Sequence, residues 1–152
     1  MTVTSFATIV LTTDFSEVSR RALPTARTLA EKFGSRIILV HVLEERMPPF
    51  LEELLPDSEE ILGRQRERAV ETLDGIAREE LGDGVNWEAM VVVGIPHQEI
   101  VEIARQNRAD LIVMATHGRG PLGHALIGST TERVLHRAPC PVMAVRVADP
   151  GS

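Results

Sequence analysis

Cysteine and long apolar segments are scarce in this sequence of 152 residues. Its single cysteine, Cys140, has no second cysteine with which to form an internal disulfide bond. No segment approaches the roughly 18 consecutive apolar residues that a membrane-spanning helix requires. The first residues lack the basic segment and the small-residue cleavage site of a secretory signal. We therefore expect a cytoplasmic protein with no membrane partner.

Aromatic side chains and positive charge are also in short supply. Only 3% of residues are aromatic, and 16 lysines and arginines are outnumbered by 22 aspartates and glutamates, which gives a net charge of −6. Proteins that bind nucleic acids neutralise phosphates with clustered cations and stack single-stranded bases on aromatic rings. The composition therefore predicts no nucleic-acid partner, whereas 43% apolar and 25% charged residues predict a folded globular chain.

Several catalytic motifs are missing as well. No Gly-x-x-x-x-Gly-Lys-Ser/Thr segment is present, and the single lysine, Lys32, lies in a predicted helix, which excludes a P-loop nucleoside triphosphatase. The segment after the first apolar run lacks the glycine fingerprint of dinucleotide-binding proteins. The five histidines lack metal-ligand spacing, and we interpret His41 and His97 as structural. Since no serine lies in a nucleophile elbow either, we assign neither catalytic residues nor metal ligands.

Short β-rich apolar runs alternate with longer segments of helical periodicity along the chain. This alternation is typical of βαβ units, in which helices cover both faces of a parallel sheet. Right-handed crossovers then favour a doubly wound α/β fold, and we expect residues 1–152 to form one domain. Five strands are predicted, over residues 6–12, 36–42, 85–93, 110–115 and 142–147.

The segment between the first two predicted strands has apolar residues at helical spacing from Ala22 to Phe33. Ser16 is a candidate N-cap, and Gly34 follows the last apolar position. Pro24 would lie inside this helix, where a proline removes one backbone hydrogen bond. We therefore predict a single helix that is kinked at Pro24.

Three further helices are predicted, over residues 58–81, 96–107 and 129–137. Pro96 suits the first position of its helix. Ser129, with Glu132 three residues later, predicts a capping box in which Ser129 is the N-cap. The connector 44–57 contains three prolines and is long for a link between a strand and a helix. We predict that this connector is a variable loop that acts as a lid or a partner contact, and that residues 148–152 form a tail.

A glycine-rich loop precedes the last predicted helix. Four glycines fall within residues 114–131, and Gly118 and Gly128 can adopt positive φ, which lets the backbone approach a ligand. The first turn of the following helix offers unpaired N–H groups and the positive end of the helix dipole. Together with Arg119, these features predict an anion-binding site. Alternatively, the glycines only turn the chain and Ser129 only caps the helix.

Asp14 ends the first predicted strand and has two interpretations. It can cap the turn that follows, which is a common role of aspartate, or it can accept a hydrogen bond from a ligand's amino group or sugar hydroxyl. His117 lies in the predicted glycine-rich loop, where it could contact a phosphate or a ribose. If the first and fourth strands are neighbours, Asp14 and the loop face one crevice beyond the carboxyl ends of the strands, where doubly wound folds bind ligands.

With these residues identified, the sequence resembles the universal stress protein family, and specifically its ATP-binding branch. That family carries Gly, two residues, Gly, nine residues and then Gly-Ser or Gly-Thr after its fourth strand. Gly118, nine intervening residues, Gly128 and Ser129 match this pattern, whereas Ala115 replaces the first glycine. The resemblance covers nearly the whole chain, including the segments TTDFS, VVGIPHQEIVEIA, DLIVMATHG, GSTTERVL and PCPVMAVR.

The resemblance implies a sheet of strand order 3-2-1-4-5 and a site for ATP, with Mg²⁺ or Mn²⁺ carried on the phosphates. Adenine is expected near Thr12, Asp14 and Val42. Ribose is expected against Met114, Ala115 and His117. The phosphates are expected along Gly118, Gly128, Ser129, Thr130 and Thr131, and Thr13 and Arg119 complete the expected set. Ala115 is tolerated at ordinary φ, but a left-handed conformation there would cost about 1 to 2 kcal/mol.

Three functional hypotheses remain. The first is a nucleotide-dependent switch in the stress response, with at most slow ATP hydrolysis, that acts on an unknown downstream protein. The second is a weak ATPase or nucleotidyl transferase of related fold, although the His-x-Gly-His segment of such transferases is missing after the first strand. The third is a nucleotide-independent interaction module. The resemblance also implies a homodimer paired through strand 142–147, which would otherwise be an exposed edge.

Overall fold

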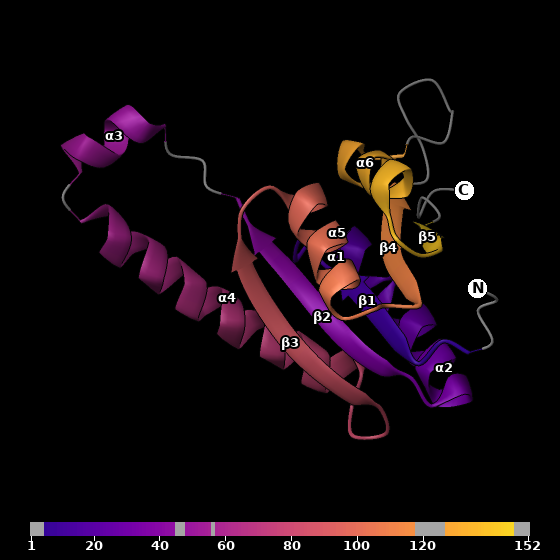
Figure 1. Ribbon diagram of the computed structural model, residues 1–152. Helices are drawn as coiled ribbons and strands as arrows, with labels where there is room; N and C mark the ends of the chain where they lie inside the picture. The colour runs from indigo at the N-terminus through magenta and orange to yellow at the C-terminus, as the bar shows by residue number, and fades with distance from the viewer. Residues whose placement is uncertain (1–4, 45–47, 56, 118–126, 148–152) are drawn as a thin grey trace.

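The computed structural model describes residues 5–44, 48–55, 57–117 and 127–147. Five parallel strands form one sheet in the order β3-β2-β1-β4-β5, with helices on both of its faces (Figure 1). This arrangement confirms the predicted doubly wound fold and its strand order. The strands are β1 (Thr8–Thr12), β2 (Arg36–Leu43), β3 (Asn86–Val93), β4 (Leu111–His117) and β5 (Val142–Val147).

Helices cover both faces of the sheet, and the sheet separates two hydrophobic cores. The helices of the described residues are α1 (Glu17–Arg20), α2 (Leu23–Phe33), α3 (Pro49–Leu54), α4 (Ser58–Glu80), α5 (Pro96–Gln106) and α6 (Ser129–Arg137). Ile9 and Leu11 of β1 belong to the core shared with α2 and α4, whereas Val10 between them belongs to the core shared with α5 and α6. Because both faces are covered, each central strand is an almost continuous apolar run.

The segment before β2 differs from the predicted single kinked helix. α1 ends at Arg20, and Pro24 lies in the first turn of a separate helix, α2. Within a continuous helix, the ring of Pro24 would clash with the carbonyl of Arg20, four residues earlier. In a first turn, by contrast, the missing N–H has no partner to lose. Ser16 caps α1, and the left-handed Gly34 ends α2, as predicted.

Several other boundaries shift by one or two residues, and β4 and the connector 44–57 differ in ways that matter for the site. β4 extends beyond its predicted end because Thr116 and His117 pair with Arg146 and Val147 of β5. His117 therefore lies in a strand and not in the glycine-rich loop. The connector 44–57 contains a short helix, α3, with Pro48 as its N-cap and Pro49 as its first residue, a position where the fixed φ of proline suits a helix.

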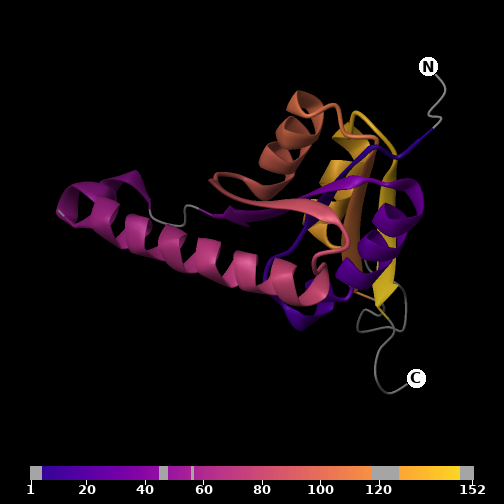
Figure 2. The same cartoon turned by 90° about the horizontal axis from the view of Figure 1, so that it is seen from below.

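α3 and the first half of α4 extend away from the sheet (Figures 1 and 2). The buried residues of α4 begin only at Ala69, so the second half of this 23-residue helix makes its core contacts. α4 is also the longest of the described helices, but none of them combines the length and the apolar character needed to cross a membrane.

Candidate functional site

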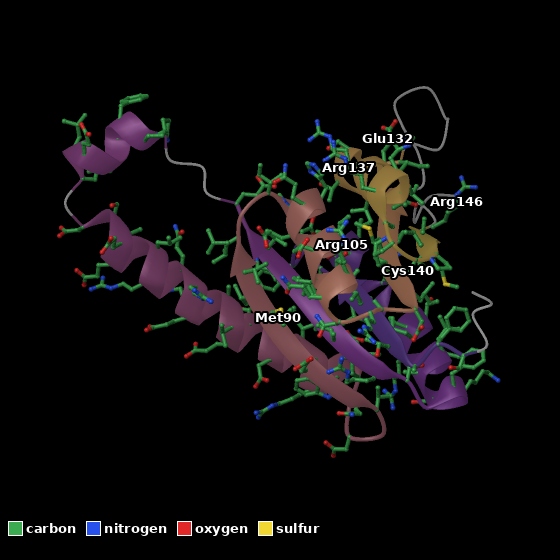
Figure 3. The ribbon with its side chains drawn as sticks, in the orientation of Figure 1. Met90, Arg105, Glu132, Arg137, Cys140 and Arg146 are labelled. Atoms are coloured by element: carbon green, nitrogen blue, oxygen red, sulfur yellow. The ribbon has the colours of Figure 1, made fainter. Side chains whose placement is uncertain are left out.

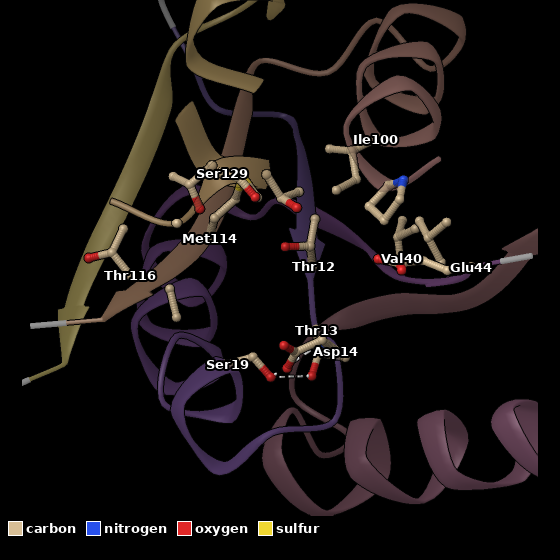
Figure 4. Close-up of a pocket in the computed structure, with 16 residues that line it drawn as sticks. Thr12, Thr13, Asp14, Ser19, Val40, Glu44, Ile100, Met114, Thr116 and Ser129 are labelled. Carbon is tan, nitrogen blue, oxygen red and sulfur yellow. Dashed lines mark hydrogen bonds between the residues drawn. The ribbon is translucent and has the colours of Figure 1, made fainter. Parts of the chain in front are cut away.

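A pocket lies at the carboxyl ends of β1, β2 and β4 (Figure 4). β2 and β4 flank β1 on opposite sides, so this is the point at which the strand order reverses. The pocket volume is about 270 Å³, which is near the lower end of the range for small-molecule sites. Its lining comes from β1 and the turn after it, β2, β4 and the starts of α5 and α6.

Most of the predicted site residues come together in this pocket. Those that line it are Thr12, Thr13, Asp14, Val42, Met114, Ala115, Gly128, Ser129, Thr130 and Thr131. Gly118 and Arg119 lie outside the described residues, as does the side chain of His117. The pocket also contains residues that sequence reasoning missed, namely Ser19, Val40, Glu44, Pro96, Ile100 and Thr116.

The alternation of side chains along a strand could have predicted two of the missed residues. Val40 shares a face of β2 with Val42, and Thr116 shares a face of β4 with Met114, because every second residue of a strand points to the same side. Both pairs line the pocket. Ser19 lies in the short helix α1, and no spacing or motif in the sequence indicates it.

Side-chain hydrogen bonds hold the turn after β1. Asp14 Oδ1 accepts a hydrogen bond from the backbone N–H of Ser16 (2.9 Å), and the Asp14 N–H donates to Ser19 Oγ (3.3 Å). The hydroxyl oxygens of Thr13 and Ser19 are 2.8 Å apart. Burial raises the pKa of the Asp14 carboxyl, but hydrogen bonds from Ser16 and Ser19 outweigh it and hold that pKa below its usual value. Asp14 thus fixes its own turn and also presents a carboxylate to the pocket.

Phe15, the next residue, has a positive φ of 70°, which is unusual for a bulky side chain. Its ring stacks on the buried His41, with centroids 3.8 Å apart and an interplanar angle of 17°. His41 Nδ1 lies 2.9 Å from the carbonyl oxygen of Thr13. Because a carbonyl can only accept, the Nδ1–H donates this hydrogen bond. His41 therefore has a structural role, as predicted, and ties the turn to β2.

The first turn of α6 has no side-chain cap. Gly128 is the N-cap, with φ −60° and ψ 154°, and Ser129 is the first helical residue. The predicted capping box is therefore wrong, because Ser129 lies one position too late, and Gly128 does not use the positive φ that a glycine allows. The Glu132 N–H donates to the Gly128 carbonyl oxygen (3.0 Å). Within the described chain, the N–H groups of Ser129, Thr130 and Thr131 have no acceptor, and these residues line the pocket.

The described lining combines an apolar wall with little charge. Asp14 and Glu44 are its charged residues, and no lysine or arginine is among the lining residues that the structure describes. The apolar part consists of Val40, Val42, Ile100 and Met114. On the side of the pocket formed by α6, the described hydrogen-bond donors for an anion are the N–H groups and hydroxyls of the first turn of that helix.

Ala115 has an ordinary strand backbone. It pairs with Val145 of β5, and among the described non-glycine residues only Phe15 and Arg108 have positive φ. The left-handed alternative for Ala115 is therefore excluded, and its methyl group causes no backbone strain.

His97 lies in the first turn of α5 and is buried. Burial lowers the pKa of its imidazole, and the guanidinium groups of Arg133 and Arg137 on α6 lower it further. Figure 3 shows basic side chains on both neighbouring helices, with Arg105 on α5 and Arg137 on α6. The neutral form of His97 is therefore favoured, which agrees with a structural role.

A doubly wound parallel sheet with a pocket at the reversal of strand order defines a Rossmann-like α/β protein. Within that class the chain belongs to the universal stress protein family, whose family model matches residues 5–146.

Similar proteins match nearly the whole length of the chain. A universal stress protein of Thermus aquaticus is 37% identical over 93% of this chain and 99% of its own length. The solved structure of MJ0577, a universal stress protein of Methanocaldococcus jannaschii, superposes with a TM-score of 0.79 and 34% identity, over 95% of this chain and 98% of that one. A universal stress protein of Archaeoglobus fulgidus, solved in complex with dAMP, shares the fold at a TM-score of 0.60 and 24% identity, over 92% and 98% of the two chains.

Proposed function

We propose that the protein binds an adenine nucleotide, with ATP as the expected ligand, in the pocket between Asp14 and the start of α6. One observation carries this proposal: the uncapped first turn of α6 lines the same pocket as an apolar wall and a carboxylate. Phosphate is favoured at a helix N-terminus because both the free N–H groups and the helix dipole attract it. An adenine ring matches the apolar wall, and its amino group matches the Asp14 carboxylate.

The proposed orientation places the base at one end of the pocket and the phosphates at the other. In Figure 4, Asp14 and Ser129 lie on different sides of the pocket. The base would contact Thr12, Thr13, Asp14 and Val42. The ribose would contact Met114, Ala115 and His117, and the phosphates would lie along Gly118, Arg119, Gly128, Ser129, Thr130 and Thr131. The roles of His117 and Gly118 rest on the family resemblance, and that of Arg119 rests on its place in the glycine-rich loop of the sequence.

A divalent cation is expected to enter with the nucleotide. The described residues contain no group of three or more His, Cys, Asp or Glu side chains that could hold a metal ion. Mg²⁺ or Mn²⁺ prefers hard oxygen ligands and is commonly bound through substrate phosphates. The hydroxyls of Ser129 and Thr130 are the residues of this pocket that suit such an ion beside the phosphates, where it would neutralise part of their charge.

We propose a switch with at most slow ATP hydrolysis. A general base has to be within hydrogen-bond reach of the attacking water, and the carboxylates of the described lining, Asp14 and Glu44, belong to the proposed base end. Occupancy would then alter the connector 44–57 or the dimer surface, and a downstream stress-response protein would bind the altered form. Hydrolysis of ATP, or transfer of its nucleotidyl group, over many catalytic cycles would instead favour the hypothesis of a weak ATPase or nucleotidyl transferase.

We further propose that the chain is a single universal-stress-protein domain over 1–152, with a variable connector at 44–57 and a tail at 148–152. β5 is an edge strand of the sheet, and unpaired edges are usually covered. Antiparallel pairing of β5 with its copy would give a homodimer with two-fold symmetry, the commonest symmetric arrangement. A cytoplasmic location, where ATP and Mg²⁺ are abundant, fits this function.

Isothermal titration calorimetry with ATP, ADP and AMP tests the proposed site. We expect one ATP per chain. Asp14→Asn retains an oxygen that can accept from Ser16 but removes the negative charge, so we expect affinity for ATP to fall about tenfold, as for the loss of one charge-assisted hydrogen bond. Asp83→Asn, an exposed residue outside the pocket, is the matched control. If the wild-type protein binds no nucleotide and releases none on denaturation, the nucleotide-independent module is favoured.

A further inference from the structure

The part of the molecule that projects from the sheet consists of α3, Leu55 and residues 57–68, and we call it the arm (Figures 1 and 2). No residue of α4 before Ala69 is buried. At 1.5 Å per residue, the helical part of the arm extends about 16 Å beyond the packed half of α4. The sheet therefore provides no core contacts for the arm.

The arm exposes a group of large apolar side chains. These are Phe50, Leu54, Leu55 and Ile61, of which Phe50 is 65% and Leu54 70% exposed. Phe50 and Leu54 are four residues apart, so they share one face of α3. Single exposed apolar residues are ordinary, but a group of them on one segment indicates an interaction surface. A helix as short as α3 is also marginal alone, so a partner that covered this face would stabilise it.

Negative charge borders these apolar side chains. Residues 48–63 contain five acidic residues and no basic one, whereas residues 64–68, at the base of the arm, contain three arginines and one glutamate. Glu60 forms an exposed ion pair with Arg64 (2.7 Å), which is worth little energy. The exposed Glu53, Asp57 and Glu59 have no ion-pair partner in the part of the chain that the structure describes. The outer part of the arm, up to residue 63, therefore presents an apolar surface with an acidic border.

We propose that the arm is a docking surface for a positively charged amphipathic helix of a partner protein. The apolar face of that helix would cover Phe50 and Leu54. Lysines and arginines beside its apolar face would lie opposite Glu53 and Glu59, which favours encounter and orientation. A second copy docked through the same outer part of its own arm would instead place acidic side chains opposite acidic side chains. This surface is distinct from the pocket, so the inference stands whether or not the protein binds a nucleotide.

Fluorescence anisotropy with the full-length protein tests the proposal without added nucleotide. The probe is a labelled 18-residue peptide of leucine and lysine at helical spacing, and the control peptide replaces each lysine by glutamate. We expect the lysine peptide to bind at least tenfold more tightly than the glutamate peptide. The double variant Phe50→Ser, Leu54→Ser should weaken binding at least tenfold, and Glu53→Gln with Glu59→Gln should weaken it several-fold and reduce its salt dependence.

Matched controls separate docking from general attraction to an acidic protein. Val70→Ser alters an exposed apolar residue of α4 outside the arm, and Asp83→Asn removes a distant negative charge; both should bind the lysine peptide like the wild type. Thermal melting confirms that each variant is folded. Equal binding of both peptides, or unchanged binding by the arm variants, overturns the proposal. It is also overturned if the peptide does not bind and sedimentation velocity shows self-association that Phe50→Ser with Leu54→Ser abolishes, since a second copy would then be the occupant.

Discussion

The two ends of the pocket are built in opposite ways. At the Asp14 end, the residues of the turn are held by other groups of the protein: the Asp14 carboxylate accepts a hydrogen bond from Ser16, and the Phe15 ring stacks on His41. At the α6 end, the helix begins at Ser129 without a side-chain cap, and its first N–H groups lack acceptors within the described chain.

This difference indicates a division of labour between the ends. A turn with saturated hydrogen bonds is rigid and can position one carboxylate for a specific contact. An uncapped helix start, by contrast, has unpaired N–H groups that can donate hydrogen bonds to a negatively charged ligand. Sequence patterns suggested a capped helix at Ser129, and the correction of that prediction supports the proposed anion site, because a serine cap would have occupied one of the donors.

The largest effect on ATP affinity is expected from removing one donor at the α6 end. Ser129→Pro deletes the first helical N–H, while Gly128, with φ −60° and ψ 154°, already has the backbone that a following proline requires. Relative to Ser129→Ala, which removes only the hydroxyl, we expect ATP affinity to fall about tenfold to hundredfold. Calorimetry measures the affinities, and thermal melting should show similar stability for both variants. Equal affinities would mean that the amide does not hold phosphate.

The saturated end is expected to lose stability when Phe15 is replaced. Phe15→Ala removes the stack on His41 and leaves a left-handed alanine, so we expect a loss of about 2 to 3 kcal/mol in the free energy of unfolding. Phe15→Gly loses the same stack but tolerates positive φ, so it should be about 1 kcal/mol more stable than Phe15→Ala. Urea unfolding of the three proteins measures these differences. A glycine variant less stable than the alanine variant would contradict the proposed role of the left-handed turn.

A smaller effect on stability is expected from His97, which lies in the first turn of α5 and faces Arg133 and Arg137 of α6. Because its pKa in the folded state lies below its ordinary value of 6.5, the unfolded chain takes up the proton first as pH falls. Stability should therefore decrease below about pH 6.5, with a slope of at most about 1.4 kcal/mol per pH unit from this one group. Unfolding free energies at pH 7.5 and 5.5 should differ less in His97→Gln than in the wild type. An equal difference in both proteins would show that His97 does not cause it.

The smallest effect is expected at Ala115. Since its backbone is an ordinary strand paired with β5, Ala115→Gly relieves no strain and should change ATP affinity by less than about threefold. Calorimetry on this variant decides the matter. A tenfold gain would mean that the methyl group obstructs the ligand directly.

Much of the architecture was accessible from the sequence because apolar periodicity reports burial. β5 and the starts of α4 and α5 lie where they were predicted. The break between α1 and α2 was misjudged because Pro24 was treated as a defect inside one helix and not as the start of another. The end of β4 depended on pairing with Arg146 and Val147, a contact between distant segments that no local pattern contains.

The candidate site was predictable where it follows the ends of strands. Asp14, Met114 and Thr131 follow from strand ends, the glycine pattern and the family resemblance, and they line one pocket. The apolar wall was only partly predicted, since Ile100 reaches the pocket from a helix whose position depends on packing. Ser19 was missed because its role depends on hydrogen bonds to Thr13 and Asp14, which exist only once the turn has formed.

Backbone amide spectra of ¹⁵N-labelled protein, recorded during titration with ATP and Mg²⁺, measure most directly whether the start of α6 binds the phosphates. The largest shifts among the residues of α6 are expected at the N–H groups of Ser129, Thr130 and Thr131, and AMP should produce smaller shifts there than ATP. Saturating ATP that leaves these three amides unmoved would contradict the proposed site.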